Sequence, residues 1–295
     1  MKHTFPNRVT FGPGGCSDSF HREGNRSTRQ APAWVRARGL DAFEYEGGNG
    51  ISAGAEALRA VGEAAREQGI LMSVHAPYFI SLSGVEEEKR LKSISYVEKS
   101  LWAAELLGAD TVVIHSGSAA KRDRKEAMAL SLDTLERLAE TVGPEPAARL
   151  GIETMGKCTQ LGTLDEVIEQ CLVSPIYPPV VDFGHLYARA CGEDMRSVDD
   201  YRRVFDKIAC RLGDPHARHL HCHFSHIEFT GAGEKKHLTF ADPIYGPAFE
   251  PLAEAILLEG VFPRIICESN GTQAEDALEM KRILEATKQK RNGEL

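Results

Sequence analysis

Histidine, aspartate or glutamate directly follows several short apolar runs of this sequence. These run-ending residues are His75, His115, Glu153, Asp182 and Glu268. If the runs are parallel strands, their carboxyl ends meet at one edge and bring these side chains together. Burying so many ionisable groups in one place is costly unless cations balance their charge. Since mixed imidazole and carboxylate ligands suit Zn, Mn or Fe better than Mg or Ca, the pattern predicts an open catalytic centre for such metals.

Histidines are also concentrated late in the chain, where five of the 11 lie within residues 216–226. The alternation of His219, His221 and His223 with other residues is typical of a strand that has one polar face. His185 follows Asp182 by three residues, close enough to join the same centre. These histidines therefore extend the predicted metal centre beyond the strand-ending set.

Apolar runs that alternate with helical stretches would position these side chains. The predicted strands are Arg8–Phe11, Ala42–Tyr45, Leu71–Val74, Thr111–Ile114, Leu150–Ile152, Val180–Val181, His219–His223 and Ile265–Cys267. The predicted helices are Ala53–Gln68, Glu87–Leu107, Lys125–Val142, Val198–Leu212 and Ala274–Thr287, each with apolar residues at helical spacing. Eight strands with interposed helices predict an α/β protein, a single (β/α)8 TIM barrel spanning residues 1–295, with the metals at its C-terminal rim.

An open, doubly wound sheet is the alternative fold. It is disfavoured because Phe11-Gly-Pro-Gly-Gly15, the glycine-rich stretch after the first strand, is interrupted by proline and is unsuited to open a helix.

Composition narrows the classes of protein further. None of the apolar runs approaches the roughly 20 residues of a membrane helix, and the first residues lack a signal-peptide core, so we expect a cytoplasmic protein. Seven cysteines without a CxxC pair argue against a disulfide framework and a zinc finger. The net charge of −8 excludes a general nucleic-acid binder. It does not exclude a damage-specific one, because bound cations would make the mouth of the barrel electropositive.

The motifs resemble those of the endonuclease IV family of apurinic/apyrimidinic endonucleases, within the xylose-isomerase-like barrel superfamily. The matching segments are His75-Ala-Pro-Tyr78, Val113–Ser118, Ile152–Gly156, Val181–His185, the histidine strand, Gly233–His237 and Cys267-Glu268. The resemblance implies a zinc-dependent hydrolase of DNA repair, with two to three ions, that cuts the phosphodiester 5′ to an abasic site with a zinc-activated hydroxide. Its implied partner is DNA containing abasic sites, with no membrane and no obligate protein partner.

The resemblance also assigns roles to individual residues. His75 and His115 would hold the first ion, and Glu153 would bridge to the second and act as the catalytic residue. Asp182, Glu268 and either His221 or His223 would complete the second site; the motif can be laid on either histidine. His185 and His237 would hold the third ion, but Lys235 stands where the family has an aspartate, with Glu234 next to it.

Substrate contacts and a competing function complete the sequence-based hypotheses. Tyr78, Lys235 and Lys236 are candidates for binding the DNA. The alternative function is a single-metal sugar isomerase or epimerase of the same superfamily, for which Glu153, Asp182, one strand histidine and Glu268 would suffice. We favour the nuclease because His75, His115, His185 and His237 have no necessary role in a one-metal sugar site. A non-enzymatic scaffold with a relic site is a third hypothesis, which the intact ligand set disfavours.

Overall fold

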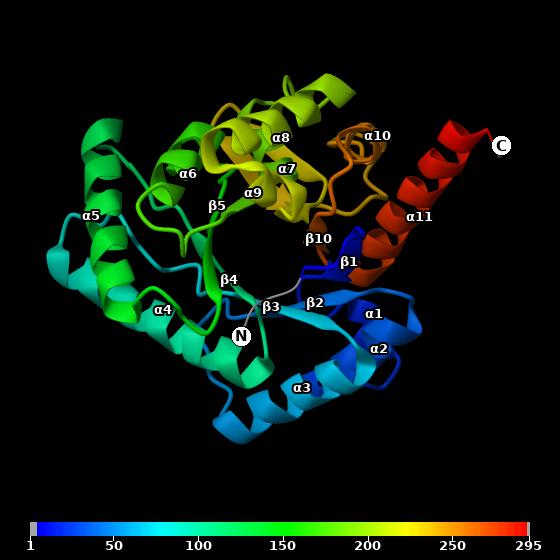
Figure 1. Cartoon of the computed structure of the whole chain (residues 1–295), viewed down its shortest axis with the longest axis horizontal. Coiled ribbons are helices and arrows are strands. Elements are labelled where there is room, and N and C mark those ends of the chain that lie inside the picture. The colour runs from blue at the N-terminus through cyan, green and yellow to red at the C-terminus, as the bar shows by residue number, and fades with distance from the viewer. Residues whose placement is uncertain (1–4, 294–295) are drawn as a thin grey trace.

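The computed structural model describes residues 5–293, and eight parallel strands form its centre (Figure 1). The strands are β1 (Thr10–Pro13), β2 (Ala42–Glu46), β3 (Leu71–His75), β4 (Thr111–His115), β5 (Arg149–Glu153), β6 (Pro179–Asp182), β7 (His221–Phe224) and β10 (Arg264–Cys267). Their order around the sheet is β1-β10-β7-β6-β5-β4-β3-β2, so strands adjacent in sequence are mostly neighbours in space. All eight predicted strands are present, although the first and seventh begin two residues later than expected.

The sheet closes almost completely into a barrel, so the open-sheet alternative does not apply. The gap lies between β1 and β2, where a single parallel bridge joins Gly14 to Glu44 and the Asp41 amide donates to the Phe11 carbonyl at 2.8 Å. A Cβ at Gly12 would lie 1.9 Å from the Ala42 carbonyl oxygen, so only glycine permits this approach of the two strands. The observed fold is the predicted (β/α)8 barrel.

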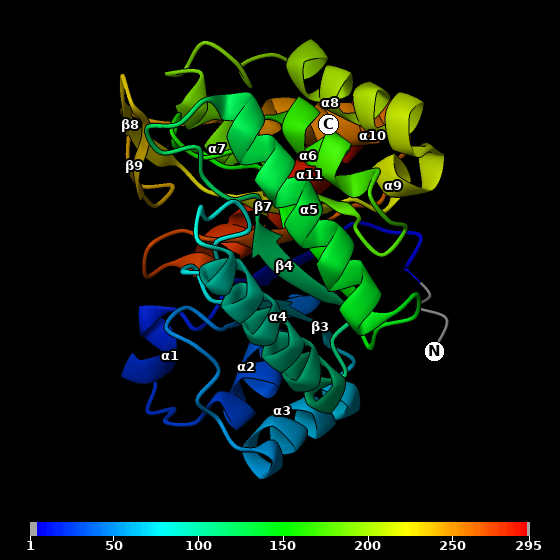
Figure 2. The same ribbon diagram turned by 90° about the vertical axis from the view of Figure 1, so that its left-hand side faces the viewer.

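Helices cover the outside of the barrel (Figures 1 and 2). They are α1 (Asp18–Arg22), a 3-10 turn (Thr28–Gln30), α2 (Ala31–Ala37), α3 (Ala55–Gln68), α4 (Glu87–Leu107), α5 (Arg124–Val142), α6 (Leu164–Cys171), α7 (Phe183–Arg189), α8 (Val198–Leu212), α9 (Asp214–Arg218), α10 (Glu250–Glu259) and α11 (Gln273–Asn292). Because strands such as β4 and β6 face helices on one side and the barrel interior on the other, their apolar residues are buried throughout.

Local signals fix several helix ends. Thr163 and Ser197 each form a capping box, in which their hydroxyl accepts from the third backbone N–H of α6 and α8. Gly108 ends α4 in the left-handed conformation that glycine adopts without strain. In the part of the chain that the structure describes, no helix is long and apolar enough to cross a bilayer, and all seven cysteines are free thiols.

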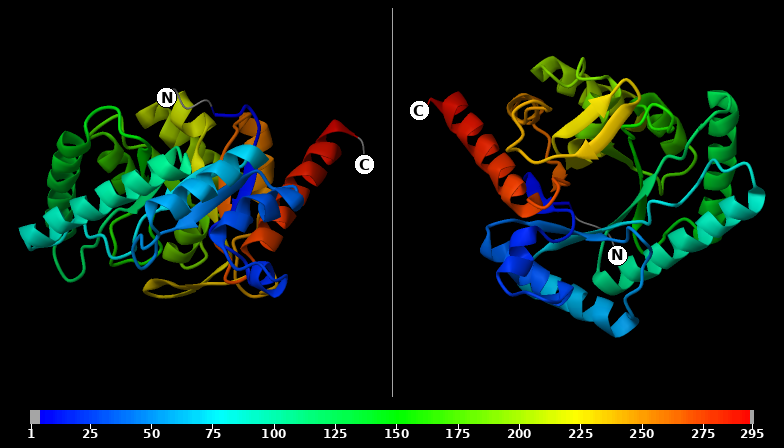
Figure 3. Two further views of the ribbon diagram at one scale, coloured as in Figure 1. Left: turned by 90° about the horizontal axis from the view of Figure 1, so that it is seen from below. Right: turned by 180° about the vertical axis from the view of Figure 1, so that it is seen from behind.

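A two-stranded antiparallel hairpin lies outside the barrel sheet. It consists of β8 (Ile227–Thr230) and β9 (Gly233–His237), and sequence patterning did not predict it. In the view from behind, the hairpin, coloured yellow, lies in front of the barrel (Figure 3). A bridge between Lys157 and Gly233 ties it to the loop after β5. The hairpin therefore carries His237 to the same end of the barrel as the strand-ending residues.

Candidate metal centre

The strand-ending residues line one cavity of about 370 Å³ at the mouth of the barrel. His75, His115 and Glu153 reach its walls from the ends of barrel strands, and His185 and Glu268 from the segments after β6 and β10. The hairpin adds Glu234 and His237. Asp182 and His223 lie directly beneath, fully buried and in contact with these residues. The structure thus gathers at one place the groups that the sequence scatters over nearly two hundred positions.

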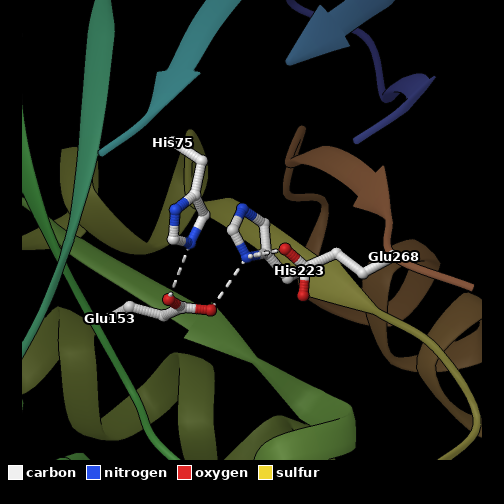
Figure 4. Close-up of side chains that lie close together, drawn as sticks. All are labelled: His75, Glu153, His223 and Glu268. Atoms are coloured by element: carbon white, nitrogen blue, oxygen red, sulfur yellow. Dashed lines mark hydrogen bonds and ion pairs between the residues drawn. The ribbon is translucent and has the colours of Figure 1, made fainter. Parts of the chain in front are cut away.

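Glu153 lies at the middle of the cluster, with its two carboxylate oxygens turned to different imidazoles (Figure 4). Oε2 is 3.4 Å from Nε2 of His75 and 3.4 Å from Nε2 of His115. Oε1 is 2.8 Å from Nδ1 of His223 and 3.6 Å from Nδ1 of His185. Each oxygen of this one carboxylate therefore faces its own pair of imidazoles, an arrangement suited to bridging two cations, although ligand atoms of His75, Glu153, His223 and Glu268 also lie within 4.8 Å of one another.

The second group of donors surrounds His223. Its Nδ1 atom, besides meeting Glu153, lies 3.3 Å from Oε1 of Glu268 (Figure 4). Asp182 adds Oδ2, a buried oxygen that accepts no hydrogen bond from the described residues, with Nδ1 of His185 at 3.4 Å, while its Oδ1 accepts from the His185 amide at 2.7 Å. A buried carboxylate oxygen left without a donor is destabilising, and a divalent cation would satisfy it. The residues present therefore fit a bound metal.

A third group of donors lies on the hairpin side of the cavity. Nε2 of His185 is 3.5 Å from Oε2 of Glu234, and Nε2 of His237 is 4.0 Å from Oε1 of the same carboxylate. Lys235 stands in place of the family's aspartate, and its neighbour Glu234 is the residue that offers a carboxylate to this group.

Gly156 makes room for this third group. A Cβ at this position would lie 2.6 Å from Cβ of Glu234 and 2.9 Å from Cδ2 of His185. Such distances are far below van der Waals contact, so a side chain here would push apart the two residues that face each other. The glycine after β5 is thus required by the packing of the hairpin against the segment after β6.

Hydrogen bonds of the other ring nitrogens orient three of these histidines. Nδ1 of His75 lies 2.8 Å from the Ala76 carbonyl, and Nδ1 of His185 lies 2.9 Å from the Thr154 carbonyl. A carbonyl only accepts, so each Nδ1 carries a proton, and it is Nε2 that faces the cavity and offers a lone pair when the ring is neutral. Nδ1 of His237 is held by the Ser225 hydroxyl at 2.8 Å. Such outer hydrogen bonds are the usual way in which proteins orient histidine ligands.

The two candidate histidines of β7 occupy different depths in the barrel. His223 reaches Glu153 and Glu268, as described above. Nε2 of His221 instead lies 3.1 Å from Glu44, and among the described residues Glu44 holds the only carboxylate within 4.0 Å of it. The geometry therefore groups His223 with the cavity residues and places His221 in a layer below them.

Protonation of the metal-free cluster reflects these contacts. Burial acts to raise the pKa of Glu153, but the charge of His223 and hydrogen bonds from His223 and His75 hold it well below its usual range. Burial acts to lower the pKa of His75, yet the hydrogen bond to Glu153 and nearby carboxylates raise it to about 10. For Glu268, burial raises the pKa to about 8. For His115, burial lowers the pKa to about 3. The ionisable groups of the cluster thus shift one another's pKa.

The predicted substrate-binding residues lie at the rim. Tyr78 is 60% exposed, lines the cavity and donates a hydrogen bond to Oδ1 of Asn49 at 3.0 Å. Lys235 and Lys236 are exposed on β9, and both pair with one carboxylate, that of Glu228, at 2.6 and 3.3 Å. Lys236 lines an adjacent hollow that also contains His237 and Glu268. Because Tyr78, Lys235 and Lys236 lie at the rim, they remain candidates for binding the substrate.

Lys157 is a cation of this cavity that the sequence analysis missed. It lies in the loop after β5, is exposed and lines the cavity together with the metal-ligand candidates. No carboxylate of the described residues lies within ion-pair distance of its ammonium group, unlike those of Lys235 and Lys236. The signal available in the sequence was its place four residues after the strand-ending Glu153.

A larger hollow of about 800 Å³ lies outside the barrel, beside α6, α7 and α8. Several of its charged residues neutralise one another, since Lys207 pairs with Asp165 at 2.7 Å and Arg203 pairs with Asp200 at 2.7 Å. Size alone therefore does not identify the functional site; convergent ionisable groups do.

Comparison of the sequence with models of protein families identifies a family with this fold. The model of the family described as xylose isomerase-like TIM barrel matches residues 32–288. An uncharacterized protein of Methanocaldococcus jannaschii is 30% identical over 221 residues, which are 72% of this chain and 77% of that protein. A probable endonuclease 4 of Streptomyces avermitilis is 26% identical over 219 residues, 71% of this chain and 69% of the relative. Other relatives of that name match over about half their length, such as 46% of the one from Pediococcus pentosaceus.

Solved structures include both nucleases and epimerases. Endonuclease IV from Thermus thermophilus superposes with a TM-score of 0.64 at 22% identity, covering 96% of this chain and 99% of that one. A D-tagatose 3-epimerase-like protein superposes with a TM-score of 0.70 at 18% identity, covering 97% and 99%. At such identities these structures are similar to the chain in fold, and the choice between activities depends on the residues of the cavity.

Proposed function

The chain belongs to the xylose isomerase-like TIM barrel family, and within that family we propose that it is a metal-dependent endonuclease that cuts DNA 5′ to abasic sites. The relatives named probable endonuclease 4 support this proposal. The donors gathered in one cavity support it more specifically, because His185, Glu234 and His237 form a possible ion site in addition to those that contain Glu153.

The observation that carries the proposal is the division of the Glu153 carboxylate between two groups of imidazoles. His75 and His115 face Oε2, whereas His223 faces Oε1. A single cation held by Glu153, Asp182, His223 and Glu268 would leave His75 and His115 without a ligand role. A cluster of cations uses every one of these residues.

We assign the donors to three ions. His75, His115 and Glu153 would hold the first; Glu153, Asp182, His223 and Glu268 the second; His185, Glu234 and His237 the third. Imidazole and carboxylate donors are those that Zn prefers, with Mn and Fe as alternatives. Bound divalent cations supply Lewis acidity and neutralise the charge of a phosphodiester. Glu153, which reaches two sites at once, sets their separation and is the residue proposed to be essential for catalysis.

Residues at the rim would receive the DNA. The unpaired ammonium group of Lys157 is placed to attract a backbone phosphate toward the donors. Tyr78, with an exposed ring at the cavity wall, is suited to pack against a nucleotide that is turned out of the duplex. Lys235 and Lys236 would contribute less, because Glu228 already partly neutralises them.

A single-metal sugar epimerase is the second candidate function. The superposition with the D-tagatose 3-epimerase-like protein favours it. Glu153, Asp182, His223 and Glu268 would supply four ligands to a single ion, and three of them, with His75 in place of Asp182, offer ligand atoms within 4.8 Å of one another. On this hypothesis His185, Glu234 and His237 would have no part in holding a metal.

Cleavage of a defined duplex separates the two functions. The zinc-loaded protein is incubated with a duplex that carries one tetrahydrofuran abasic analogue, with and without chelator. The proposal expects a single nick 5′ to the analogue, loss of nicking with chelator, and no nicking of the undamaged duplex.

Two controls make the assay decisive. Glu153→Gln, which keeps the shape of the side chain, should lower the nicking rate by about 10³-fold while circular dichroism stays unchanged. Turnover of ketohexoses without nicking of the abasic duplex would reject the nuclease in favour of the epimerase.

A further inference from the structure

A buried polar layer lies directly beneath the candidate metal centre. It contains Glu44 of β2, Ser73 of β3, and His221 and His223 of β7, each at most 5% exposed. Neither the resemblance nor the family assigns a role to Glu44, and the sequence analysis did not single it out. Yet a carboxylate buried in the barrel interior is costly unless it has a structural or functional partner.

Glu44 divides its two oxygens among three partners. Oε2 accepts a hydrogen bond from the Ser73 hydroxyl at 2.7 Å and lies 3.1 Å from Nε2 of His221. Oε1 lies 2.9 Å from Nε2 of His223. Neither Oε1 of Glu44 nor Nε2 of His223 forms a hydrogen bond of good geometry among the described residues, so the 2.9 Å approach is an ion-pair contact between two buried polar atoms. These two buried atoms therefore have only each other to satisfy their polarity.

The contact has a consequence for the opposite nitrogen of the same ring. Both ring nitrogens of His223 face carboxylates, so a cation that binds at Nδ1 must replace the proton on that side, and the Glu44 carboxylate beside Nε2 then keeps the proton on Nε2. Nδ1 is the atom that faces Glu153 at 2.8 Å and Glu268 at 3.3 Å. The order Glu44, His223, cavity is that of a carboxylate–histidine–metal relay, in which the outer carboxylate orients the ligand.

The same carboxylate accounts for the different placement of the two β7 histidines. Nε2 of His221 is engaged by Glu44. His223, two residues further along the strand, meets Glu44 with one nitrogen and the cavity with the other. His221 and Ser73 thus hold Glu44 from below, and Glu44 holds His223.

We propose that Glu44 is a positioning residue of the metal centre, which fixes the ring of His223 so that Nδ1 faces the cation shared with Glu153 and Glu268. The proposal rests on the proposed function only in that it requires a metal at this place. It assigns to His221 and Ser73 the task of keeping the Glu44 carboxylate in position.

Binding of Co²⁺ provides the test, because its visible absorption reports the ligand field whether or not the protein cuts DNA. Metal-free wild-type protein and Glu44→Gln are titrated with Co²⁺ in competition with a chelator. The proposal expects a change in the absorption spectrum and a loss of affinity of about 10- to 100-fold in Glu44→Gln, the range seen when an outer partner of a ligand is lost. Unchanged affinity and an unchanged spectrum would overturn it.

Asp41→Asn is the matched control. Asp41 immediately precedes β2, is 4% exposed and pairs with Arg8 and Lys281 away from the cavity. Its loss removes a buried carboxylate of the same segment but should leave the Co²⁺ affinity and spectrum as in the wild type. An equal loss of affinity in Asp41→Asn and Glu44→Gln would mean a general effect on the fold, contrary to the proposal.

Ser73→Ala keeps the proposal testable if Glu44→Gln does not fold. It removes one hydrogen bond to Glu44 without changing any charge, and it should weaken Co²⁺ binding several-fold, about the effect of one hydrogen bond. Affinity equal to that of the wild type would count against the proposal. If the wild-type protein itself binds no Co²⁺, the proposed metal centre fails, which is a different result from intact binding in the variants.

Discussion

Nδ1 of His223 lies 2.8 Å from Oε1 of Glu153, in the fully buried floor of the cavity. The other oxygen of the same carboxylate is turned away, toward His75 and His115. A carboxylate shared in this way can hold two cations at a fixed separation, whereas a carboxylate with one occupied oxygen holds one. The relation between these two residues is the basis for favouring a multi-metal nuclease over a single-metal epimerase.

Removal of the Glu234 carboxylate should empty one metal site. Glu234→Ala takes away the acidic partner of His185 and His237, and two imidazoles alone bind a divalent cation weakly. Elemental analysis of the dialysed variant should find about one ion per chain fewer than in the wild type. Lys235→Ala, which alters the adjacent exposed residue, is the control and should keep the full metal content. Equal metal content in Glu234→Ala and the wild type would contradict the assignment.

Loss of the cation at position 157 should weaken binding of DNA. The ammonium group of Lys157 is unpaired and lines the cavity, so Lys157→Ala should raise the KM for an abasic duplex about tenfold and lower the salt dependence of binding by about one counterion. Lys235→Ala, whose cation is paired with Glu228, should have a smaller effect. A salt dependence that is unchanged in Lys157→Ala but reduced in Lys235→Ala would reverse the two roles.

Metal binding should strengthen as the pH rises. The pKa of His75 is raised to about 10 by its hydrogen bond to Glu153 and by nearby carboxylates, against the effect of burial, so this imidazole is protonated at neutral pH in the metal-free protein. A cation must displace that proton, and competition weakens as protons become scarce. Chelator competition at pH values of about 6, 7.5 and 9 should therefore give increasing Zn²⁺ affinity. Affinity independent of pH would contradict this coupling.

The raised pKa of His75 also predicts how the stability of the metal-free protein changes with pH. Because the folded-state pKa of His75 exceeds its unfolded value, its contribution to stability is complete below pH 6.5 and is lost as the pH rises toward about 10. Urea unfolding of the metal-free protein should shift to lower midpoints over that interval. The zinc-loaded protein should show a smaller decline, since bound metal replaces the proton as the partner of Glu153.

A buried ion pair at the opposite end of the barrel should stabilise the fold without affecting the site. Arg264 donates to both oxygens of Asp110 at 2.8 and 2.6 Å. Asp110→Asn leaves the buried guanidinium poorly paired and should cost about 3 kcal/mol in the free energy of unfolding. Asp133→Asn, which alters a 41% exposed carboxylate on α5, should cost less than about 1 kcal/mol. Similar costs for the two variants would contradict the importance of the buried pair.

The pH dependence of this pair has a definite sign. Burial acts to raise the pKa of Asp110, but the charge of Arg264 and its hydrogen bonds lower it to about 2. The stabilisation is therefore complete above the unfolded value of about 3.8 and is lost as the pH falls toward 2. The difference in unfolding free energy between the wild type and Asp110→Asn should shrink over that interval.

The sequence was sufficient to predict the barrel and most of the cavity residues. Residues such as His115 and Glu153 could be found because each ends an apolar run, and parallel strands bring such ends to one rim. The capping box of Thr163 and Glu166 is a signal of the same local kind, since it marks the start of α6. These signals are local in the chain, and the geometry of a closed barrel converts them into a site.

Other features depend on geometry that no local pattern encodes. Glu234 and His237 are three residues apart on a strand, where simple alternation would place them on opposite faces; a register irregularity in the hairpin accompanies their meeting at His185. The choice between His221 and His223 depends on depth within the barrel, which is set by the register of β7 against β6, where His223 is level with Asp182. The ion pairs of Lys235 and Lys236 with Glu228 likewise follow from the unpredicted hairpin.

The positions of bound ions around Glu153 test the central claim most directly. Crystals of the zinc-loaded protein, measured at the zinc absorption edge, should show one anomalous peak between Oε2 of Glu153 and the imidazoles of His75 and His115. A second peak should lie between Oε1 of Glu153, His223 and Glu268. A single peak beside His223 and Glu268, with none near His75 and His115, would contradict the bridging role of Glu153 and favour the one-metal epimerase.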